Sequence, residues 1–204
     1  SDYIGALDEI KESIRFAKHA GNKRMEGLSI WLNGNLYKNI GETEKAIQNY
    51  NLSLNIAKQS DDHYVLGRCY NALGNINKNT GNYLEALDFY EKALKSAEKI
   101  NNESDMDVHL ENISFIYYLL ADYKRSLKFI NKAIVISEKN KNNFQSGEHY
   151  SFISKIYNQQ GEYKKAHKYA LKSLSLLKKT GNTRGISLAY ESLAEISLKT
   201  NNLP

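Results

Sequence analysis

The fold is decided by one string, NYLEALDFYEKALKSA at residues 82–97, because near copies of it return along the chain. They are DYIGALDEIKESIRFA at 2–17, ETEKAIQNYNLSLNIA at 42–57, DYKRSLKFINKAIVIS at 122–137 and EYKKAHKYALKSLSLL at 162–177. The copies stand forty residues apart and align without an insertion or a deletion. Five copies in one register indicate a repeat architecture rather than one or two globular domains.

Each period holds two helical segments. In the copy at 82–97 the apolar residues follow the spacing of an amphipathic helix, at Tyr83, Ala86, Leu87, Tyr90, Leu94 and Ala97. The other segment of each period has a small residue at a fixed position, after a Leu or Ile in four of five cases, as in Leu73-Gly74 and Ile113-Ser114, which lets two helices approach closely. The chain is therefore predicted to form ten helices of about 16–18 residues, each roughly 25 Å long at the α-helical rise.

The links between helices carry stop and start signals. Gly41, Gly81 and Gly161 share one phase of the repeat and suit the left-handed position that ends a helix. Asn-rich links such as Gly21-Asn22 and Asn101-Asn102 are typical of a helix end followed by a new start. The single proline of the chain is its last residue, so glycine and asparagine have to end the helices.

This pattern resembles the tetratricopeptide repeat. The similar positions in the first helix are Gly34 with Tyr37 and Tyr70 with Leu73-Gly74; those in the second helix are Ala46, Tyr50, Ser53; Ala86, Tyr90, Ala93; Ser126, Ile130, Ala133; and Ala166, Ala170, Ser173. The resemblance covers the whole chain, although the usual family period is about six residues shorter. It implies an all-α fold, a right-handed superhelical α-solenoid of antiparallel helix pairs, whose concave face binds a peptide or a partner protein.

A single solenoid domain is expected over residues 1–204. Its full repeats would be 21–60, 61–100, 101–140 and 141–180, with half repeats at 1–20 and 181–204. Because the chain starts inside one repeat and stops inside another, we expect it to be a fragment of a longer protein. Solenoid ends need polar caps, and neither end shows one, so end-to-end self-association is a further expectation.

Composition and charge exclude several classes. The 204 residues are 41% hydrophobic and 25% charged, with a net charge of +5 and one cysteine, Cys69. No run of like charges resembles a nucleic-acid arm, and no apolar run approaches the ~20 residues of a membrane span. We expect no nucleic-acid partner and no membrane contact by this segment. Cysteine usage favours a cytoplasmic location, with the periplasmic sensor region of a membrane protein as the alternative.

No pattern of catalysis stands out. A phosphate-binding GxxxxGK loop, GxSxG and HExxH are all missing from the sequence. His109 and His149 share one phase, with Cys69 one repeat earlier. Equivalent residues of stacked helices lie about 8–10 Å apart, too far to share a metal ion, so packing is the expected role of these residues. We therefore expect no enzyme activity, no metal and no cofactor.

The resemblance implies that the first helix of each repeat faces the concave side. The candidate partner-binding residues on this stripe are Trp31, Asn35, Lys38, Arg68, Asn71, Asn75, Lys78, Glu111, Phe115, Tyr118, Glu148 and Lys155. The first two repeats offer basic side chains and amides, the third offers Phe115 and Tyr118, and the last two are acidic at Glu148 and Glu195. An extended or helical segment whose acidic part lies over the first two repeats would suit this gradient.

Two function classes remain open from the sequence. The first is a non-enzymatic module that binds a protein or peptide, as a scaffold or as the sensing region of a larger regulator. The second is the sensor of a signalling enzyme, such as a histidine kinase or a phosphatase-type regulator, whose catalytic domain lies outside these residues. The reading frame on either side of residues 1–204 would separate them.

Overall fold

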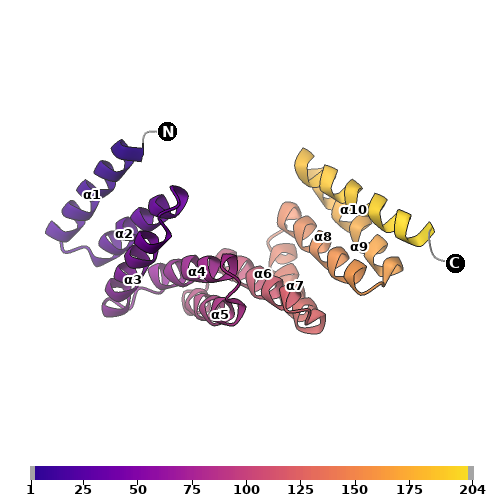
Figure 1. The fold of residues 1–204 in the computed structure, drawn as a ribbon, viewed down its shortest axis with the longest axis horizontal. Coiled ribbons are helices and arrows are strands. Elements are labelled where there is room, and N and C mark those ends of the chain that lie inside the picture. Colours follow the sequence, from indigo (N-terminus) through magenta and orange to yellow (C-terminus); the bar gives the residue numbers. More distant parts are fainter. Residues whose placement is uncertain (1–2, 202–204) are drawn as a thin grey trace. The chain divides into compact units, whose positions relative to one another are not determined.

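The computed structural model describes residues 3–201, which form ten α-helices joined by short turns (Figure 1). They are α1 (Tyr3–His19), α2 (Lys23–Asn39), α3 (Thr43–Gln59), α4 (His63–Asn79), α5 (Tyr83–Lys99), α6 (Glu103–Leu119), α7 (Tyr123–Lys139), α8 (Asn143–Gln159), α9 (Tyr163–Thr180) and α10 (Thr183–Asn201). The described residues contain no strand, so the predicted all-α helical repeat fold is confirmed. Alternate helices start forty residues apart, in the register of the sequence repeat.

Two compact units follow one another along the chain. Residues 1–109 make the first, with α1 to α5 and the beginning of α6, and residues 110–204 make the second, with the rest of α6 and α7 to α10. The first two and last three residues of the predicted domain lie outside the described part. The single domain over 1–204 and the handedness of the superhelix stay predictions.

A left-handed residue reverses the chain every twenty residues. Positive φ angles occur at Gly21, Gly41, Asp61, Gly81, Asn101, Ala121, Lys141, Gly161 and Gly181. After α2, the N–H of Glu42 donates to the carbonyl of Tyr37 at 2.9 Å and that of Gly41 to Lys38 at 3.2 Å, the pair of bonds of a Schellman motif. The predicted role of the glycines at this phase is confirmed, and four other residues fill the same role under strain.

The helix that follows each left-handed residue at 21, 61, 101, 121, 141 and 181 is capped by a side chain. Asn22, Asn102 and Asn142 accept the backbone N–H three residues later at 3.0–3.1 Å. Asp62 does the same for Val65 at 3.1 Å. These caps satisfy N–H groups that the first turn of a helix leaves unpaired, so the Asn-rich links start helices as the sequence predicts.

The turn at Ala121 is a place to gain stability. An L-residue in the left-handed region costs about 1–2 kcal/mol, and glycine avoids this cost but loses some backbone entropy. We expect Ala121→Gly to raise the free energy of unfolding by about 0.5–1 kcal/mol in urea titrations. Gly41→Ala, at φ 85° with open space around the added methyl group, should lower it. A loss of stability in Ala121→Gly would contradict this account.

One part of the core of the first unit lies between α3 and α4. Ala46, Tyr50, Leu54 and Ala57 of α3 pack against Val65, Leu66, Cys69, Ala72, Leu73 and Ile76 of α4, and all of these are buried. Their positions recur every three or four residues, so each helix presents one apolar stripe to its neighbour. The sequence stripe assigned to packing is therefore the one that is buried.

Within each early repeat, a glycine and a tyrosine set the distance between the two helices. A Cβ added at Gly34 would lie 2.6 Å from Cε1 of Tyr50, and one at Gly74 would lie 2.8 Å from Cε1 of Tyr90. Both tyrosines are fully buried. The tyrosine ring thus fills the space over the glycine, and no larger residue fits there while the ring stays.

The later repeats solve the same packing problem differently. Ile130 and Ala170 stand where the earlier repeats have tyrosine, and Ser114 and Ser154 stand where they have glycine. The Ser114 hydroxyl donates to the carbonyl of Ser126, and the Ser154 hydroxyl donates to that of Ala166, both at 2.7 Å. A smaller residue on one helix therefore accompanies a larger, hydrogen-bonded residue on the other.

This exchange can be tested by a double-mutant cycle. Gly34→Ser should destabilise by about 1–3 kcal/mol through overpacking, and Tyr50→Ile by about 2–4 kcal/mol through the cavity it leaves. In the double variant the serine gains room to donate to Ala46, so the two losses should not add, with a coupling of about 1 kcal/mol or more. Combining Gly34→Ser with Tyr90→Ile, in another repeat, is the additive control. Additivity in both pairs would contradict the proposed exchange.

One part of the core of the second unit lies between α8, α9 and α10. Ala166, Ala170, Leu174 and Leu177 of α9 are buried, together with Ala189 and Ile196 of α10. On the α8 side, the ring of Tyr169 stacks on Tyr150 and Tyr157, with centroids 5.9 and 5.5 Å apart.

Among the described residues no helix combines the length and apolar character needed to cross a membrane.

Candidate functional site

The twelve candidate residues predicted from the sequence all lie on the first helices of the repeats, α2, α4, α6 and α8. Each is half-buried or exposed, so none belongs to the core. Seven of them, from Trp31 to Lys78, belong to the first unit, and five, from Glu111 to Lys155, belong to the second. The two groups are described one after the other.

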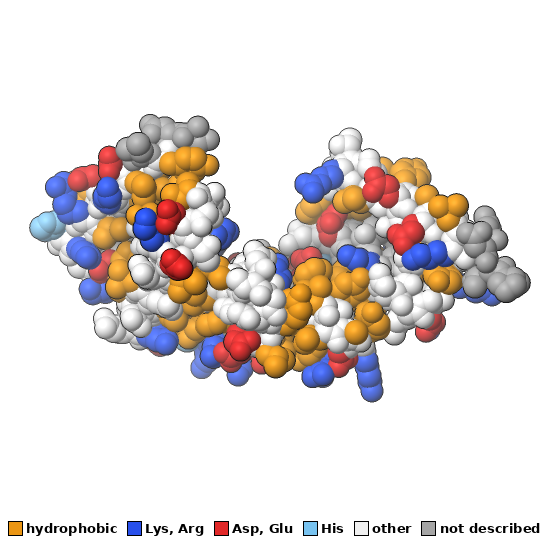
Figure 2. Space-filling model, viewed as in Figure 1, with side chains coloured by type: hydrophobic (Ala, Val, Ile, Leu, Met, Phe, Trp, Pro, Cys, Tyr) orange, Lys and Arg blue, Asp and Glu red, His pale blue; other side chains and the backbone are white. Residues whose placement is uncertain are grey.

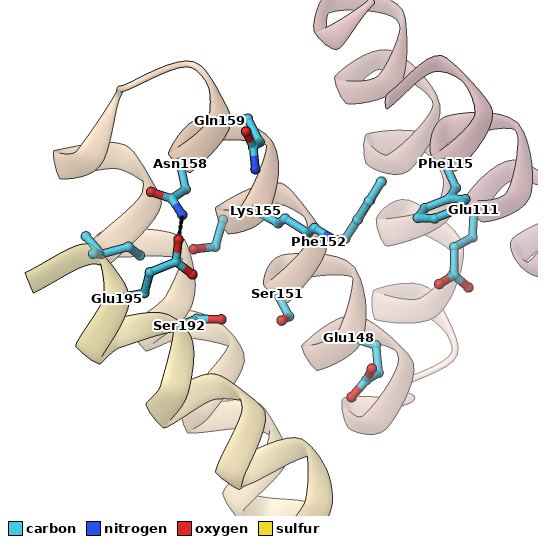
Figure 3. Close-up of a pocket in the computed structure, with 12 residues that line it drawn as sticks. Glu111, Phe115, Glu148, Ser151, Phe152, Lys155, Asn158, Gln159, Ser192 and Glu195 are labelled. Atoms are coloured by element: carbon cyan, nitrogen blue, oxygen red, sulfur yellow. Dashed lines mark hydrogen bonds between the residues drawn. The ribbon is translucent and has the colours of Figure 1, made fainter. Parts of the chain in front are cut away.

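In the second unit the stripe opens into a pocket of about 430 Å³ between α6, α8 and α10 (Figure 3). Four predicted residues line it: Glu111, Phe115, Glu148 and Lys155. The remaining lining comes from Ser151, Phe152, Ser154, Asn158, Gln159, Ser192, Glu195 and Ile196. The volume lies within the range of about 300–1,000 Å³ typical of ligand pockets.

Aromatic rings form one wall of this pocket. The Phe115 ring lies 5.8 Å from that of Phe152 and 6.2 Å from that of Tyr118, and Tyr118 and Phe152 meet edge to face at 5.4 Å. The Nζ atom of Lys155 lies 5.2 Å from the centre of the Tyr118 ring. The apolar patch predicted at Phe115 and Tyr118 therefore exists as a cluster, and a cation already rests on one of its ring faces.

Charged and amide groups form the rest of the pocket. Glu195 accepts hydrogen bonds from Lys199 at 2.7 Å and from the amide of Asn158 at 3.1 Å (Figure 3). These bonds, that of Lys199 foremost, lower the pKa of the Glu195 carboxyl group. Glu195 is therefore a carboxylate at neutral pH, and the pocket lining carries Glu111, Glu148 and Glu195 against one lysine.

Three of the pocket's residues lie just outside the predicted stripe. Phe152, Gln159 and Ser192 directly follow Ser151, Asn158 and Glu191, which occupy the repeat positions of Trp31 and Lys38. Phe152 is the important omission, because it touches both predicted aromatic residues. The available signal was its place beside the variable stripe, since the corresponding position of other repeats holds Leu32, Ala72 and Asn112.

In the first unit Arg68 is the centre of an aromatic cluster. Its guanidinium carbon lies 5.3 Å from the centre of the Trp31 ring and 4.8 Å from that of Tyr64. It also donates to the Tyr64 hydroxyl at 2.7 Å. Trp31 packs against the core of the unit on its other side, so the ring is held in place as an anchor would be. Tyr64 is a member of this cluster that the sequence did not identify.

The predicted amides have a structural task. The hydroxyl of the buried Tyr50 donates to Asn35 Oδ1 at 2.8 Å, and Tyr90 donates to Asn75 Oδ1 at the same distance. An oxygen that already accepts from the core has less to offer a peptide, while the amide nitrogens remain donors. The later repeats lack the tyrosine and carry Phe115 and Lys155 at this position, where both residues line the pocket.

The cysteine and the two histidines that share one phase of the repeat are buried. Cys69 is inaccessible, and burial raises the pKa of its thiol to about 11, so it is no thiolate at neutral pH. His109 and His149 are buried as well. No three or more His, Cys, Asp or Glu side chains between residues 3 and 201 come together as metal ligands would.

On the face seen in Figure 2, Lys and Arg side chains are scattered among acidic and uncharged ones in each unit.

The buried imidazole of His109 makes stability depend on pH. Burial is the main cause that lowers its pKa to about 4; Asp105 acts against this shift and Arg68 adds to it. The unfolded chain takes up a proton near the ordinary value of about 6.5, whereas the folded chain does so only near pH 4. The contribution of the neutral His109 to the free energy of unfolding is therefore fully present above pH 6.5 and is lost as the pH falls toward 4.

Urea titrations between pH 4 and 7.5 should show this loss, up to about 3 kcal/mol from His109 alone. His109→Ala, which copies Ala189 of the last repeat, should reduce the slope of unfolding free energy against pH in this window. His19→Ala, at an exposed position of α1, is the matched control and should leave the slope unchanged. Equal slopes in wild type and His109→Ala would show that another group is responsible.

Comparison with known proteins identifies the repeat. Residues 28–99 match the tetratricopeptide repeat family. No curated protein sequence matches the chain. A crystal structure of BtubC (BKLC) from P. vanneervenii is similar, with a TM-score of 0.74 and 15% identity over 100% of this chain and 94% of that one. The resemblance to the tetratricopeptide repeat predicted from the sequence is thereby confirmed.

Two further structures of larger proteins share the fold. One is a signal transduction ATPase with numerous domains and a tetratricopeptide repeat sensor, from Pyrococcus horikoshii, with a TM-score of 0.78 and 20% identity over 90% of this chain. The other is aspartyl phosphate phosphatase F from Bacillus subtilis, with a TM-score of 0.80 and 18% identity over 92% of this chain. The chain spans 29% and 49% of their lengths. At these identities the likeness establishes the fold alone.

Proposed function

We propose that this chain, which carries tetratricopeptide repeats, is a non-enzymatic module that binds a polypeptide segment on the face formed by the first helices of its repeats. The observation that carries the proposal is the pocket between α6, α8 and α10, in which Phe115 of the predicted stripe and the neighbouring Phe152 form an aromatic wall beside several charged groups. Phe115 and Phe152 line this cavity, and Tyr118 packs against both rings, an arrangement that solvation alone does not require.

The first unit presents a different surface in this proposal. Lys38, Arg68 and Lys78 are all at least partly accessible on α2 and α4. We propose that they meet an acidic part of the partner, with Trp31 as the apolar anchor. Arg68 is suited to this role because stacking on Trp31 and Tyr64 fixes its guanidinium group before the partner arrives.

The module would act as a scaffold or as the sensing region of a larger regulator. An alternative is the sensor of a signalling enzyme whose catalytic domain lies outside this chain. It is supported by the likeness to a signal transduction ATPase that contains a tetratricopeptide repeat sensor and to a phosphatase, each longer than this chain. A cytoplasmic location remains part of the proposal, and the flanking reading frame would separate the alternatives.

Selection from a displayed library of random peptides tests the binding face. A selected peptide, labelled for fluorescence anisotropy, should lose about tenfold or more in affinity on Phe115→Ala, as expected for a central aromatic contact. Leu84→Ala, which removes an exposed apolar side chain of α5, is the control and should bind as wild type does. Circular dichroism should show that each variant keeps its helical content.

A second pair of variants examines the first unit. Arg68→Glu and Lys38→Glu should weaken binding of selected acidic peptides by about threefold to tenfold, more strongly at low salt. Lys38 keeps the test independent of the aromatic contacts of Arg68, because it is exposed. Affinities unchanged by Phe115→Ala, Arg68→Glu and Lys38→Glu would refute the assignment of the binding face.

A further inference from the structure

The pocket between α6, α8 and α10 is more acidic than the chain that contains it. Its lining holds the carboxylates of Glu111, Glu148 and Glu195 against the single ammonium group of Lys155, while the whole chain has a net charge of +5. We propose that this pocket binds an arginine side chain of the partner segment. The inference rests on the proposed function and names the residue type that the second unit selects.

The carboxylates come from three different helices. Glu111 lies on α6, Glu148 on α8 and Glu195 on α10, and all three line one cavity. Glu111 and Glu148 are half-buried, so water screens them less than it screens an exposed side chain. In Figure 3 the carboxylate groups of Glu111 and Glu148 extend from their helices on the side of the pocket where Phe115 lies. A cation in this cavity would meet carboxylates that come from different helices.

The aromatic wall favours a guanidinium group over other cations. Phe115 and Phe152, with ring centres 5.8 Å apart, border the same cavity as the carboxylates. A guanidinium group stacks on an aromatic face and at the same time donates two parallel hydrogen bonds to a carboxylate. An ammonium group is more strongly hydrated and has no flat face to stack, so lysine should fit this mixture of surfaces less well.

The chain itself shows how this wall accepts a positive charge. Lys155 places its ammonium group 5.2 Å from the centre of the Tyr118 ring. The carboxylate of Glu195 is held by Lys199 and Asn158, and Lys155 also contributes to the lowering of its pKa. With Lys199 counted beside Glu195, three carboxylates stand against two ammonium groups, and this negative excess opposes the binding of an anion. Charge complementarity thus points to a cationic ligand.

An NMR titration of the full chain with N-acetyl-arginine N-methylamide tests the proposal. We expect shifts of the backbone amides between Glu148 and Gln159 that saturate in the millimolar range, the weak affinity of a single side chain. The citrulline analogue keeps the shape but not the charge, and it should bind about tenfold more weakly or not at all. The lysine analogue should fall between them. Equal binding of arginine and citrulline would overturn the proposal.

Charge variants give the sign of the interaction. Glu111→Gln and Glu148→Gln should each weaken arginine binding about threefold to tenfold, and Lys155→Met should strengthen it about twofold to threefold by removing the competing cation. A pocket built for an anion would respond with the opposite signs. Glu162→Gln removes one carboxylate of the same unit outside this pocket and should leave the affinity unchanged. Opposite signs, or no response to Glu111→Gln and Glu148→Gln, would refute the inference.

Selected peptides separate this inference from the proposed function. Peptides that contain arginine and lose affinity on both Phe115→Ala and Glu148→Gln support both. Peptides that lose affinity on Phe115→Ala, lack arginine and ignore Glu148→Gln leave the binding face in place and refute the choice of arginine. Peptides that ignore Phe115→Ala, Arg68→Glu and Lys38→Glu refute the binding face and the arginine pocket together.

Discussion

The closest approach between the two helices of a repeat governs what the neighbouring surface can do. At Gly34 and Gly74 the tyrosine of the second helix lies over the glycine, and its hydroxyl reaches the next residue, an asparagine. That asparagine is at once part of the surface stripe and a partner of the core. Where Ile130 or Ala170 replaces the tyrosine, there is no tyrosine hydroxyl to donate to the surface position, and that position holds Phe115 or Lys155. A change in the core thus accompanies a change of chemistry on the surface.

The same reasoning explains why the second unit has the pocket. Serine at positions 114 and 154 ties its helix to the carbonyls of α7 and α9. The following side chains, Phe115 and Lys155, then have no tyrosine hydroxyl to satisfy. They extend into the space between α6, α8 and α10, where Phe152 and Glu195 join them. On each of these helices, one residue (Ser114 or Ser154) packs against the second helix, and the next residue (Phe115 or Lys155) lines the pocket.

Much of the fold could be predicted because its signals are local. A left-handed glycine such as Gly41 and an asparagine cap such as Asn22 act within one turn of helix. The apolar stripe of each helix recurs every three or four residues, so burial along α3 and α4 follows from the pattern. The site was harder, because Phe152 becomes important only through the rings of Phe115 and Tyr118 on another helix.

The forty-residue register, the helices, their turns and the stripe of variable residues can all be inferred from the order of the amino acids. The helices, turns and stripe depend on spacing within one or two helical turns, and the register on similar strings at a fixed interval, so all are visible without a structure. Three relations appear only in the folded chain: Asn35 accepts a hydrogen bond from Tyr50, Arg68 lies between Trp31 and Tyr64, and three glutamates share one pocket. Those relations depend on how far one helix is rotated and shifted against another, and packing in three dimensions sets both quantities.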